Sequence, residues 1–342
     1  MRARLEDVAK LAKVHPATAS RALNEHTRSR VSPETLERVL RAVEKLNYRP
    51  NTMARSLASA RSSTIGVVIG DLAVPLFADM IRGIDDALSE AGYTALIVNT
   101  DNDPERELRH LRSLEERRVD GLIVTTSLLN DTDESRRFSR VAPLINLLRS
   151  AGDPTIGQVI SNDALGMAQI IQHLHDLGHR RIALVAGPPT ISTALARLRG
   201  YRNALLENGY NIDNDLVVPI DHIDTAQGRR AAAQLLDNTD ATAIIGFNDM
   251  VTFGVLQELR ARRLHCPTDI SVVGYSDVPA AELVAPALTT VAVDHYKMGV
   301  EAARMMLEML NKPDEFVPRS IELPVHLVVR ETTAAVPAAA AN

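Results

Sequence analysis

The stretch Pro16-Ala-Thr-Ala-Ser-Arg-Ala-Leu-Asn24 decides how the N-terminal part of this 342-residue chain folds. Its opening proline suits the first turn of a helix, because the missing N–H has no partner there, and His15 is placed to cap that turn. Ala19, Ala22 and Leu23 recur at helical spacing and form an apolar stripe. The segment therefore predicts a short helix that buries this stripe and presents its polar residues outward.

Two further short helices flank this segment. Before it, apolar residues recur at helical spacing from Leu5 to Ala12, and Val14 marks the break. After it, Ser32-Pro33-Glu34 offers a hydroxyl cap, a proline at the first position and an acid near the positive end of the helix dipole. Residues 1–48 are thus expected to form an all-α helix-turn-helix head. The third helix is expected to bury Leu36, Val39, Leu40, Val43 and Leu46.

Charge is distributed unevenly along the chain, whose net charge is −5. Residues 1–61 hold 13 Lys or Arg and 6 Asp or Glu, a net charge of +7, whereas the rest holds 25 and 37, a net charge of −12. A basic head can neutralise phosphates and release condensed counterions, while an acidic body is repelled from a duplex. The distribution indicates that nucleic acid binds the head.

Composition is that of a soluble globular protein, with 45% hydrophobic and 24% charged residues. No apolar run approaches the roughly 18 residues that a membrane helix needs. The first ten residues lack the apolar core of a signal peptide, and the single cysteine, Cys266, cannot form an internal disulfide. We therefore expect a cytoplasmic protein that does not associate with membranes.

From Thr64 onward, strand-like apolar runs alternate with amphipathic helices in two successive cycles, which predicts two α/β lobes with parallel sheets. The ends of the strands are expected to face a shared crevice, where open α/β sheets bind ligands. Two late runs, 290–293 and 320–325, are expected to recross between the lobes. The other strand-like runs are 65–69, 94–98, 121–125, 144–147, 182–186, 217–220, 244–247 and 271–275.

Motifs throughout the chain resemble the LacI/GalR family of bacterial transcriptional regulators. In the head, the opening Pro16–Asn24 stretch and Leu46-Asn-Tyr-Arg-Pro-Asn51 carry the resemblance. In the body, Val119-Asp-Gly-Leu-Ile-Val124, Leu177-Gly-His-Arg-Arg-Ile-Ala183 and Asp269-Ile-Ser-Val-Val-Gly-Tyr275 carry it. The family implies a periplasmic-binding-protein-like body whose closure around a small-molecule effector shifts two DNA-binding heads in a homodimer.

The resemblance also implies domain boundaries. The helix-turn-helix domain spans 1–48 and a hinge helix or linker spans 49–62. The N-terminal lobe spans 63–162 and 292–322, the C-terminal lobe spans 163–291 and 323–333, and 334–342 form a tail without the heptads of a coiled coil.

In that family the second helix enters the major groove of a palindromic operator. This implies that Pro16, Ala17 and Arg21 face base edges, while Thr18, Ser20 and Asn24 hold the backbone. On spacing alone, Arg21 could equally pair with Glu25 in solvent. The longer loop after this helix adds Arg28 and Arg30, which either contact phosphates or lie in solvent.

The segment from Asn51 to Ser59 is short and rich in alanine, so it should order only when something binds it. The resemblance implies a hinge helix that enters the minor groove, with Leu57 wedged into a base step and Ala54 and Arg55 close to the groove. For Leu57, ordinary packing between domains is the alternative.

Mapped by motif, the effector cleft is implied to be lined by Asp71, Phe77, Ile191, Thr193, Arg197, Ile223, Asn248, Ser276 and Val293. Arg197 could give two parallel N–H bonds to a ligand, and the alternative is a charge on the surface of a helix, preceding Arg199. Asn248 could equally serve only as a helix cap. Ser276, Ile223 and Val293 depart from the polar and aromatic residues of sugar-binding members. The sequence therefore predicts an effector that is smaller or more apolar than a sugar.

Three histidines, His173, His175 and His179, are too poorly spaced for a metal site and favour a solvated helix end. The chain has none of the phosphate-binding, dinucleotide-binding or hydrolase motifs, so neither a catalytic site nor a cofactor is expected. The prediction is a sequence-specific repressor controlled by an effector that acts as inducer or as corepressor. The main alternative is a solute-binding protein without DNA function, and a more distant one is a sugar kinase.

Overall fold

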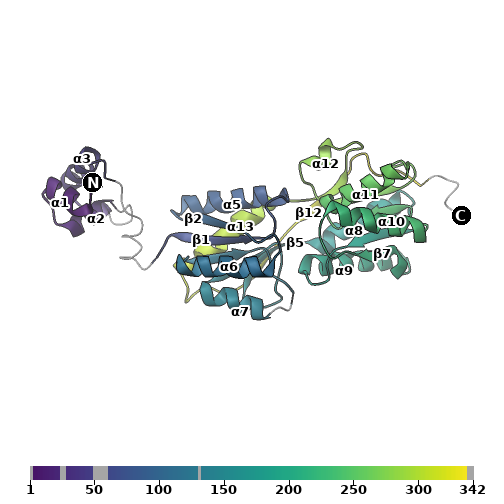
Figure 1. Cartoon of the computed structure of the whole chain (residues 1–342), viewed down its shortest axis with the longest axis horizontal. Coiled ribbons are helices and arrows are strands. Elements are labelled where there is room, and N and C mark those ends of the chain that lie inside the picture. Colours follow the sequence, from purple (N-terminus) through teal and green to yellow (C-terminus); the bar gives the residue numbers. More distant parts are fainter. Residues whose placement is uncertain (1–2, 24–27, 49–60, 130–131, 337–342) are drawn as a thin grey trace. The chain divides into compact units, whose positions relative to one another are not determined.

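The computed structural model of the chain describes residues 3–23, 28–48, 61–129 and 132–336. The chain divides into two compact units, Met1–Ser62 and Ser63–Asn342, and each is considered by itself (Figure 1).

The head is a bundle of three short helices around a core of small residues. Lys13 has a φ of 55° and ends the first helix in the left-handed conformation. The His15 ring then accepts the backbone N–H of Ala17 at 3.2 Å, and Ser32 accepts that of Thr35, so both predicted caps are confirmed. The helices are α1 (Leu5–Ala12), α2 (Pro16–Leu23) and α3 (Pro33–Lys45), and a 3-10 turn, η1, spans Arg28–Arg30.

The buried face of the head is narrower than the sequence predicted. Val8, Ala19, Ala22 and Val39 are fully buried. Leu40, expected in the core, is 41% exposed. It adjoins Val39 on α3, and neighbouring residues of a helix point about 100° apart, so both cannot face the same core.

The first lobe holds a six-stranded sheet that is parallel throughout, in the order β11-β5-β4-β3-β1-β2. Continuous runs of buried β-branched residues, such as those of β1, form its strands because both faces are covered. The strands are β1 (Thr64–Ile69), β2 (Thr94–Asn99), β3 (Gly121–Val124), β4 (Leu144–Leu147), β5 (Gly157–Ser161) and β11 (Ser320–Leu323).

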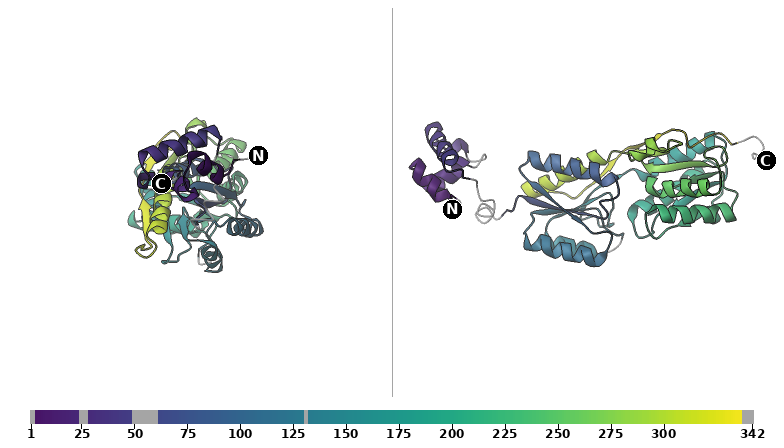
Figure 2. Two further views of the ribbon diagram at one scale, coloured as in Figure 1. Left: turned by 90° about the vertical axis from the view of Figure 1, so that its left-hand side faces the viewer. Right: turned by 45° about the horizontal axis from the view of Figure 1, so that its top comes forward.

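Helices α5 and α13 pack together on one face of this sheet, and α6 and α7 contact each other on the other (Figure 2). A Cβ added at Gly83 of α5 would lie 2.1 Å from the carbonyl oxygen of Tyr296, and one at Gly299 of α13 would lie 2.1 Å from that of Met80. The two helices therefore touch through their backbones. Their bounds are α5 (Leu76–Glu90), α6 (Pro104–Glu116), α7 (Thr132–Val141) and α13 (His295–Asn311).

The second lobe repeats this plan with the strand order β12-β10-β9-β8-β6-β7, in which only the β10–β12 pair is antiparallel. Its strands are β6 (Ile182–Ala186), β7 (Val217–Pro219), β8 (Ala243–Ile245), β9 (Ser271–Ser276), β10 (Thr289–Val293) and β12 (Val325–Val328). Its helices are α8 (Asp163–Asp176), α9 (Ser192–Glu207), α10 (Thr225–Asn238), α11 (Asp249–Ala261) and α12 (Ala280–Leu283), with a 3-10 turn, η2, at Asn214–Leu216.

The chain passes between the two sheets three times: from β5 into α8, from β10 into α13 and from β11 into β12. The predicted fold class, two parallel-dominated α/β lobes after an all-α head, is confirmed. β5, α7, α12 and α13 were not predicted from the sequence, and of α8 only its C-terminal end near Gly178 was.

Candidate functional site

The outer face of α2 carries the residues expected to meet DNA. Ala17, Ser20 and Arg21 are exposed, and Pro16 and Thr18 are half-buried. This orientation follows from the burial of Ala19 and Ala22 on the opposite face. The other predicted contacts, Asn24, Asn51, Ala54, Arg55 and Leu57, lie outside the described residues.

The longer loop after α2 is tied back to that helix. Nε of Arg28 donates to the carbonyl oxygen of Ala22 at 3.2 Å, so it satisfies an acceptor near the C-terminal end of α2. Arg30 is exposed. Of the two loop arginines, Arg28 thus has a structural contact, and Arg30 presents its charge to solvent.

In the body, a cavity of about 490 Å³ opens between the two lobes at the carboxyl ends of their strands. Its walls bring together eight of the nine predicted effector residues: Asp71, Phe77, Ile191, Thr193, Arg197, Ile223, Asn248 and Ser276. The ninth, Val293, does not line it. Val293 ends β10, where it pairs with Val325 and packs into the hydrophobic core.

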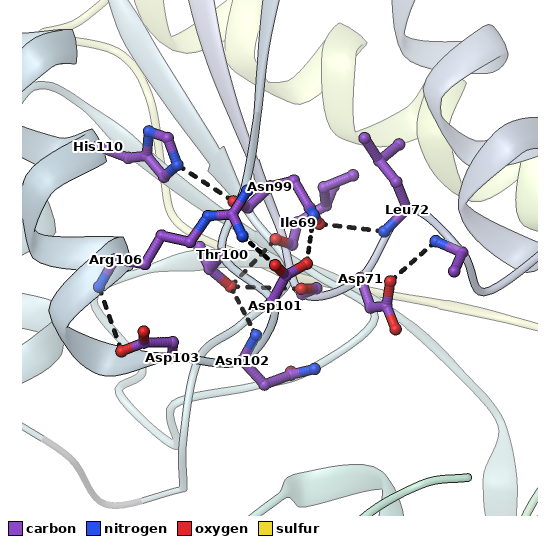
Figure 3. Close-up of polar contacts among 12 residues, drawn as sticks. Ile69, Asp71, Leu72, Asn99, Thr100, Asp101, Asn102, Asp103, Arg106 and His110 are labelled. Carbon is purple, nitrogen blue, oxygen red and sulfur yellow. Dashed lines mark hydrogen bonds and ion pairs between the residues drawn. The ribbon is translucent and has the colours of Figure 1, made fainter.

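The first-lobe wall is formed by the loops after β1 and β2 (Figure 3). The carboxylate of Asp71 accepts the N–H of Ala73 at 2.9 Å, and the side chain of Asn99 accepts the N–H of Leu72 at 3.0 Å. Asp101 pairs with Arg106, and both Asp101 and Asn102 adopt a positive φ. These hydrogen bonds and the ion pair fix the loops after β1 and β2 in the wall of the cavity.

On the second-lobe wall, Asn248 caps helix α11. Its Oδ1 accepts the N–H of Val251 at 3.0 Å while the residue also lines the cavity. The capping role considered from the sequence is therefore confirmed. Within the described residues, Nδ2 of Asn248 donates to no other protein group, so it is available to a ligand.

Arg197 is held by the protein itself. Nε donates to Asp163 Oδ1 at 3.1 Å and Nη1 to the carbonyl oxygen of Phe247 at 2.7 Å. The guanidinium carbon lies 3.7 Å from the ring centre of Tyr275, and the side chain is 7% exposed. Two of the five N–H donors of the guanidinium are thus used by the protein, which fixes a positive charge in the cavity wall, and the remaining donors lie on Nη1 and Nη2.

Three carboxylates of the wall were missed by the sequence analysis: Asp101, Asp221 and Asp224. All three lie in loops that follow edge strands, Asp101 after β2 and the other two after β7. Asp224 also caps α10 through a bond from the N–H of Gln227 at 2.7 Å. The rule that ligands bind at the carboxyl ends of parallel strands would have found them.

A second cavity of about 340 Å³ shares Leu148 and Thr193 with the first. It is lined largely by α9 and by the β5–α8 crossing, away from the loops that follow β1, β2 and β9. The polar strand-end residues therefore mark the larger cavity as the candidate ligand site.

The histidines do not form the solvated helix end that the sequence favoured. His179 is 3% exposed, and its ring contacts Thr242, Ser271 and the carbonyl of Ala334. Burial lowers the pKa of His179 and of His173. These contacts attach the C-terminal segment to the second lobe. Among the described residues, no cluster of His, Cys, Asp and Glu has the arrangement of a metal site.

A helix-turn-helix head joined to two α/β lobes around a polar cavity defines a ligand-responsive DNA-binding regulator. Residues 4–51 match the family model described as bacterial regulatory proteins, lacI family, and residues 171–333 match a periplasmic binding protein-like domain. With the full-length relatives below, these matches show that the chain belongs to the LacI family of transcriptional regulators.

The ribose operon repressor of Halalkalibacterium halodurans is 34% identical to this chain over 96% of both sequences. A Lac repressor dimer bound to operator and the anti-inducer ONPF has 29% identity and a TM-score of 0.85, with 98% of this chain and all of that chain covered. A CelR–cellobiose complex has 32% identity and a TM-score of 0.74, with 97% and 100% covered. Of the helices in the described part of this chain, none combines the length and hydropathy that a membrane span requires.

Proposed function

We propose that this chain is a cytoplasmic repressor that binds a palindromic operator as a homodimer and acts by binding alone, without catalysis. The exposed face of α2 in a head with a net charge of +7 carries the proposal. Ala17 and Arg21, with Pro16 at the start of the helix, would meet base edges, and Thr18, Ser20 and Asn24 would hold phosphates.

The linker, residues 49–62, would connect the head to the body and enter the minor groove through Asn51, Ala54, Arg55 and Leu57. Two heads are needed for a two-fold site, and the Lac repressor relative is a dimer on its operator. A homodimer therefore follows for this chain as part of the same proposal.

The effector would be an uncharged, polyhydroxylated molecule such as a sugar. The four aspartates of the wall, Asp71, Asp101, Asp221 and Asp224, can accept hydrogen bonds from hydroxyl groups. They outnumber the two arginines of the wall, Arg149 and Arg197, so their combined charge would disfavour a phosphate. Val293, on which the expectation of an apolar effector partly rested, lies outside the cavity wall. Relatives named for ribose or bound to cellobiose agree with this class.

Selection of bound duplexes from a random pool, followed by titration of the best site at two salt concentrations, tests DNA binding. Wild type should recover a two-fold site with a steep salt dependence. Arg21→Ala should lose about 1–3 kcal/mol and relax the preference at one base position. Arg41→Ala, in an exposed pair with Glu37 on α3, is the control and should retain that preference. Recovery of no site, with any sugar present or absent, would contradict the proposal.

Calorimetric titration with ribose, cellobiose and ribose 5-phosphate tests the effector class. A neutral sugar should bind and the phosphate ester should not. Asp221→Asn, which keeps the size of the side chain, should weaken the binding of the sugar. Preferential binding of the phosphate ester would overturn the assignment.

A further inference from the structure

The turn that ends β9 has an unusual backbone conformation. Ser276 has a φ of 126° and Asp277 a φ of 53°. Residues other than glycine rarely adopt a positive φ. Each such residue costs on the order of 1–3 kcal/mol of stability, and it persists only where the surrounding structure holds its backbone in place. Two consecutive positions of this kind indicate a turn whose shape serves a purpose.

The first of these residues presents its hydroxyl to the ligand cavity. Ser276 lines the cavity and is only 4% exposed. Within the described part of the chain, its hydroxyl makes no hydrogen bond to another protein group. Because no protein group uses this hydroxyl and the residue borders the cavity, it is available to a ligand.

The second residue is fixed from the side by an arginine. Nη1 of Arg330 donates to Asp277 Oδ1 at 2.7 Å and to the carbonyl oxygen of Leu288 at 2.9 Å. The backbone N–H of Arg330 donates to Thr289 Oγ1 at 2.9 Å. The two charged side chains are 18% and 23% exposed, so water screens their attraction only partly. Arg330 is thereby locked to the strand that adjoins the turn.

A buried carboxylate holds the far end of the turn. Asp249 Oδ2 accepts the N–H of Val278 at 2.9 Å, and Oδ1 accepts the hydroxyl of Thr290 at 2.6 Å. A Cβ at Gly274 would lie 2.3 Å from Oδ1, so the glycine makes room for the carboxylate. The turn is therefore anchored at Asp277 and at Val278, and Ser276 is the residue left to face the cavity.

We propose that Asp277 and Arg330 are positioning residues of the effector site, whose ion pair holds the strained turn so that the Ser276 hydroxyl points at the ligand. This rests on the proposed role of the cavity as the effector site. Neither Asp277 nor Arg330 lines the cavity. The effect of the pair on binding passes through the backbone of Ser276.

The test is a double-mutant cycle of Asp277→Asn, Arg330→Met and their combination in the full-length protein. Asparagine tolerates a positive φ, so Asp277→Asn removes the charge without disfavouring the turn. Ribose affinity is measured by calorimetry, and amide hydrogen exchange is measured for residues 274–281. Arg319→Met is the control, because it also breaks an arginine–carboxylate pair, the more exposed one with Glu308 in the first lobe.

Each single variant should weaken ribose binding about tenfold, and the double variant should be no weaker than the worse single, as for residues coupled by contact. Exchange at 276–278 should rise in these variants and stay unchanged in Arg319→Met. If the pair only supports the fold, exchange rises at 288–290 alone and ribose affinity stays at the wild-type value, which refutes the proposal.

If wild type binds neither ribose nor cellobiose, the proposed effector class is not supported, and the exchange at 276–278 in Arg330→Met still decides whether the pair holds the turn. Faster exchange there supports the positioning role. Wild-type exchange there overturns it.

Discussion

His295 is a single residue whose burial should shape how stability depends on pH. It begins α13, directly after a crossing between the lobes, and is 7% exposed. Burial, with a smaller effect from the positive charge of Arg197, lowers the pKa of His295 to about 4. The unfolded chain then binds this proton near pH 6.5 and the folded chain only near pH 4. Stability from this residue is therefore present above pH 6.5 and is lost as the pH falls toward 4.

His295→Gln should remove that loss. Between pH 7 and pH 4.5, wild type should lose on the order of 2–3 kcal/mol more unfolding free energy than the variant does. Urea denaturation at the two pH values measures the difference. Asp249, whose pKa burial raises to about 6, acts in the opposite direction but is common to both proteins. Exposed His326→Gln is the control, and equal pH dependence in all three proteins would refute the assignment.

Ser276 should lower the stability of the protein and strengthen the binding of the effector. Glycine adopts a φ of 126° without the strain that serine bears, so Ser276→Gly should raise the free energy of unfolding by about 1 kcal/mol. The variant should also bind the effector more weakly, because the hydroxyl is gone. Thermal denaturation and calorimetry measure the two effects. Ser320→Gly, in an ordinary strand position, should instead lower stability; a loss of stability in both variants would show that the turn is not strained.

Individual site residues could be predicted only as far as sequence motifs or strand ends mark them. Asn248 and Ser276 were assigned to the cleft from family motifs and do line the cavity, and each follows or ends a recognisable strand. Arg197 was also placed there, but its partner Asp163 is the first residue of α8, a helix whose start was not predicted. A bond between residues so far apart in sequence depends on the tertiary packing, which spacing does not reveal.

At the scale of elements, the contact between α5 and α13 depends on glycine. Gly83→Ala and Gly299→Ala each place a methyl group about 2.1 Å from a carbonyl oxygen of the other helix, and backbone cannot move aside as a side chain can. Each variant should lose about 1–3 kcal/mol of unfolding free energy, the usual range for overpacking. Denaturant titration measures this, with exposed Ser89→Ala on α5 as the control. A loss no larger than that of the control would mean that the helices can separate freely.

The predicted elements were those with a strong local pattern. Continuous buried runs such as β1 and β6 were found directly. By contrast, β5 alternates buried and half-buried residues over only five positions, and α8 has a broadly apolar surface that blurs the helical period. α13 adds a glycine to such a pattern, and Gly299 is explained only by its contact with α5, more than 200 residues earlier in the chain. Tertiary contacts thus decide the elements that local pattern leaves ambiguous.

At the scale of the whole molecule, the head and the body differ in the sign of their net charge. The head has its own small core, and the body has separate and larger cores. The net charge is +7 for the first and −12 for the second. Attraction to a duplex should therefore reside in the head, and the body should reduce the affinity for nonspecific DNA rather than add to it.

A chain that begins at Ser63 should therefore keep ligand binding and lose DNA binding. Its ribose affinity should stay within about twofold of the wild-type value. Gly70 is the first residue of the cavity wall in the chain, so the truncation removes none of the wall, and distant sites act independently. It should not bind a random duplex even at low salt, where electrostatic attraction is strongest. Calorimetry and a fluorescence-anisotropy titration measure the two properties. Persistent binding of the duplex by this acidic body would require a second DNA-binding surface outside the head, and loss of ribose binding would require the head to support the cavity.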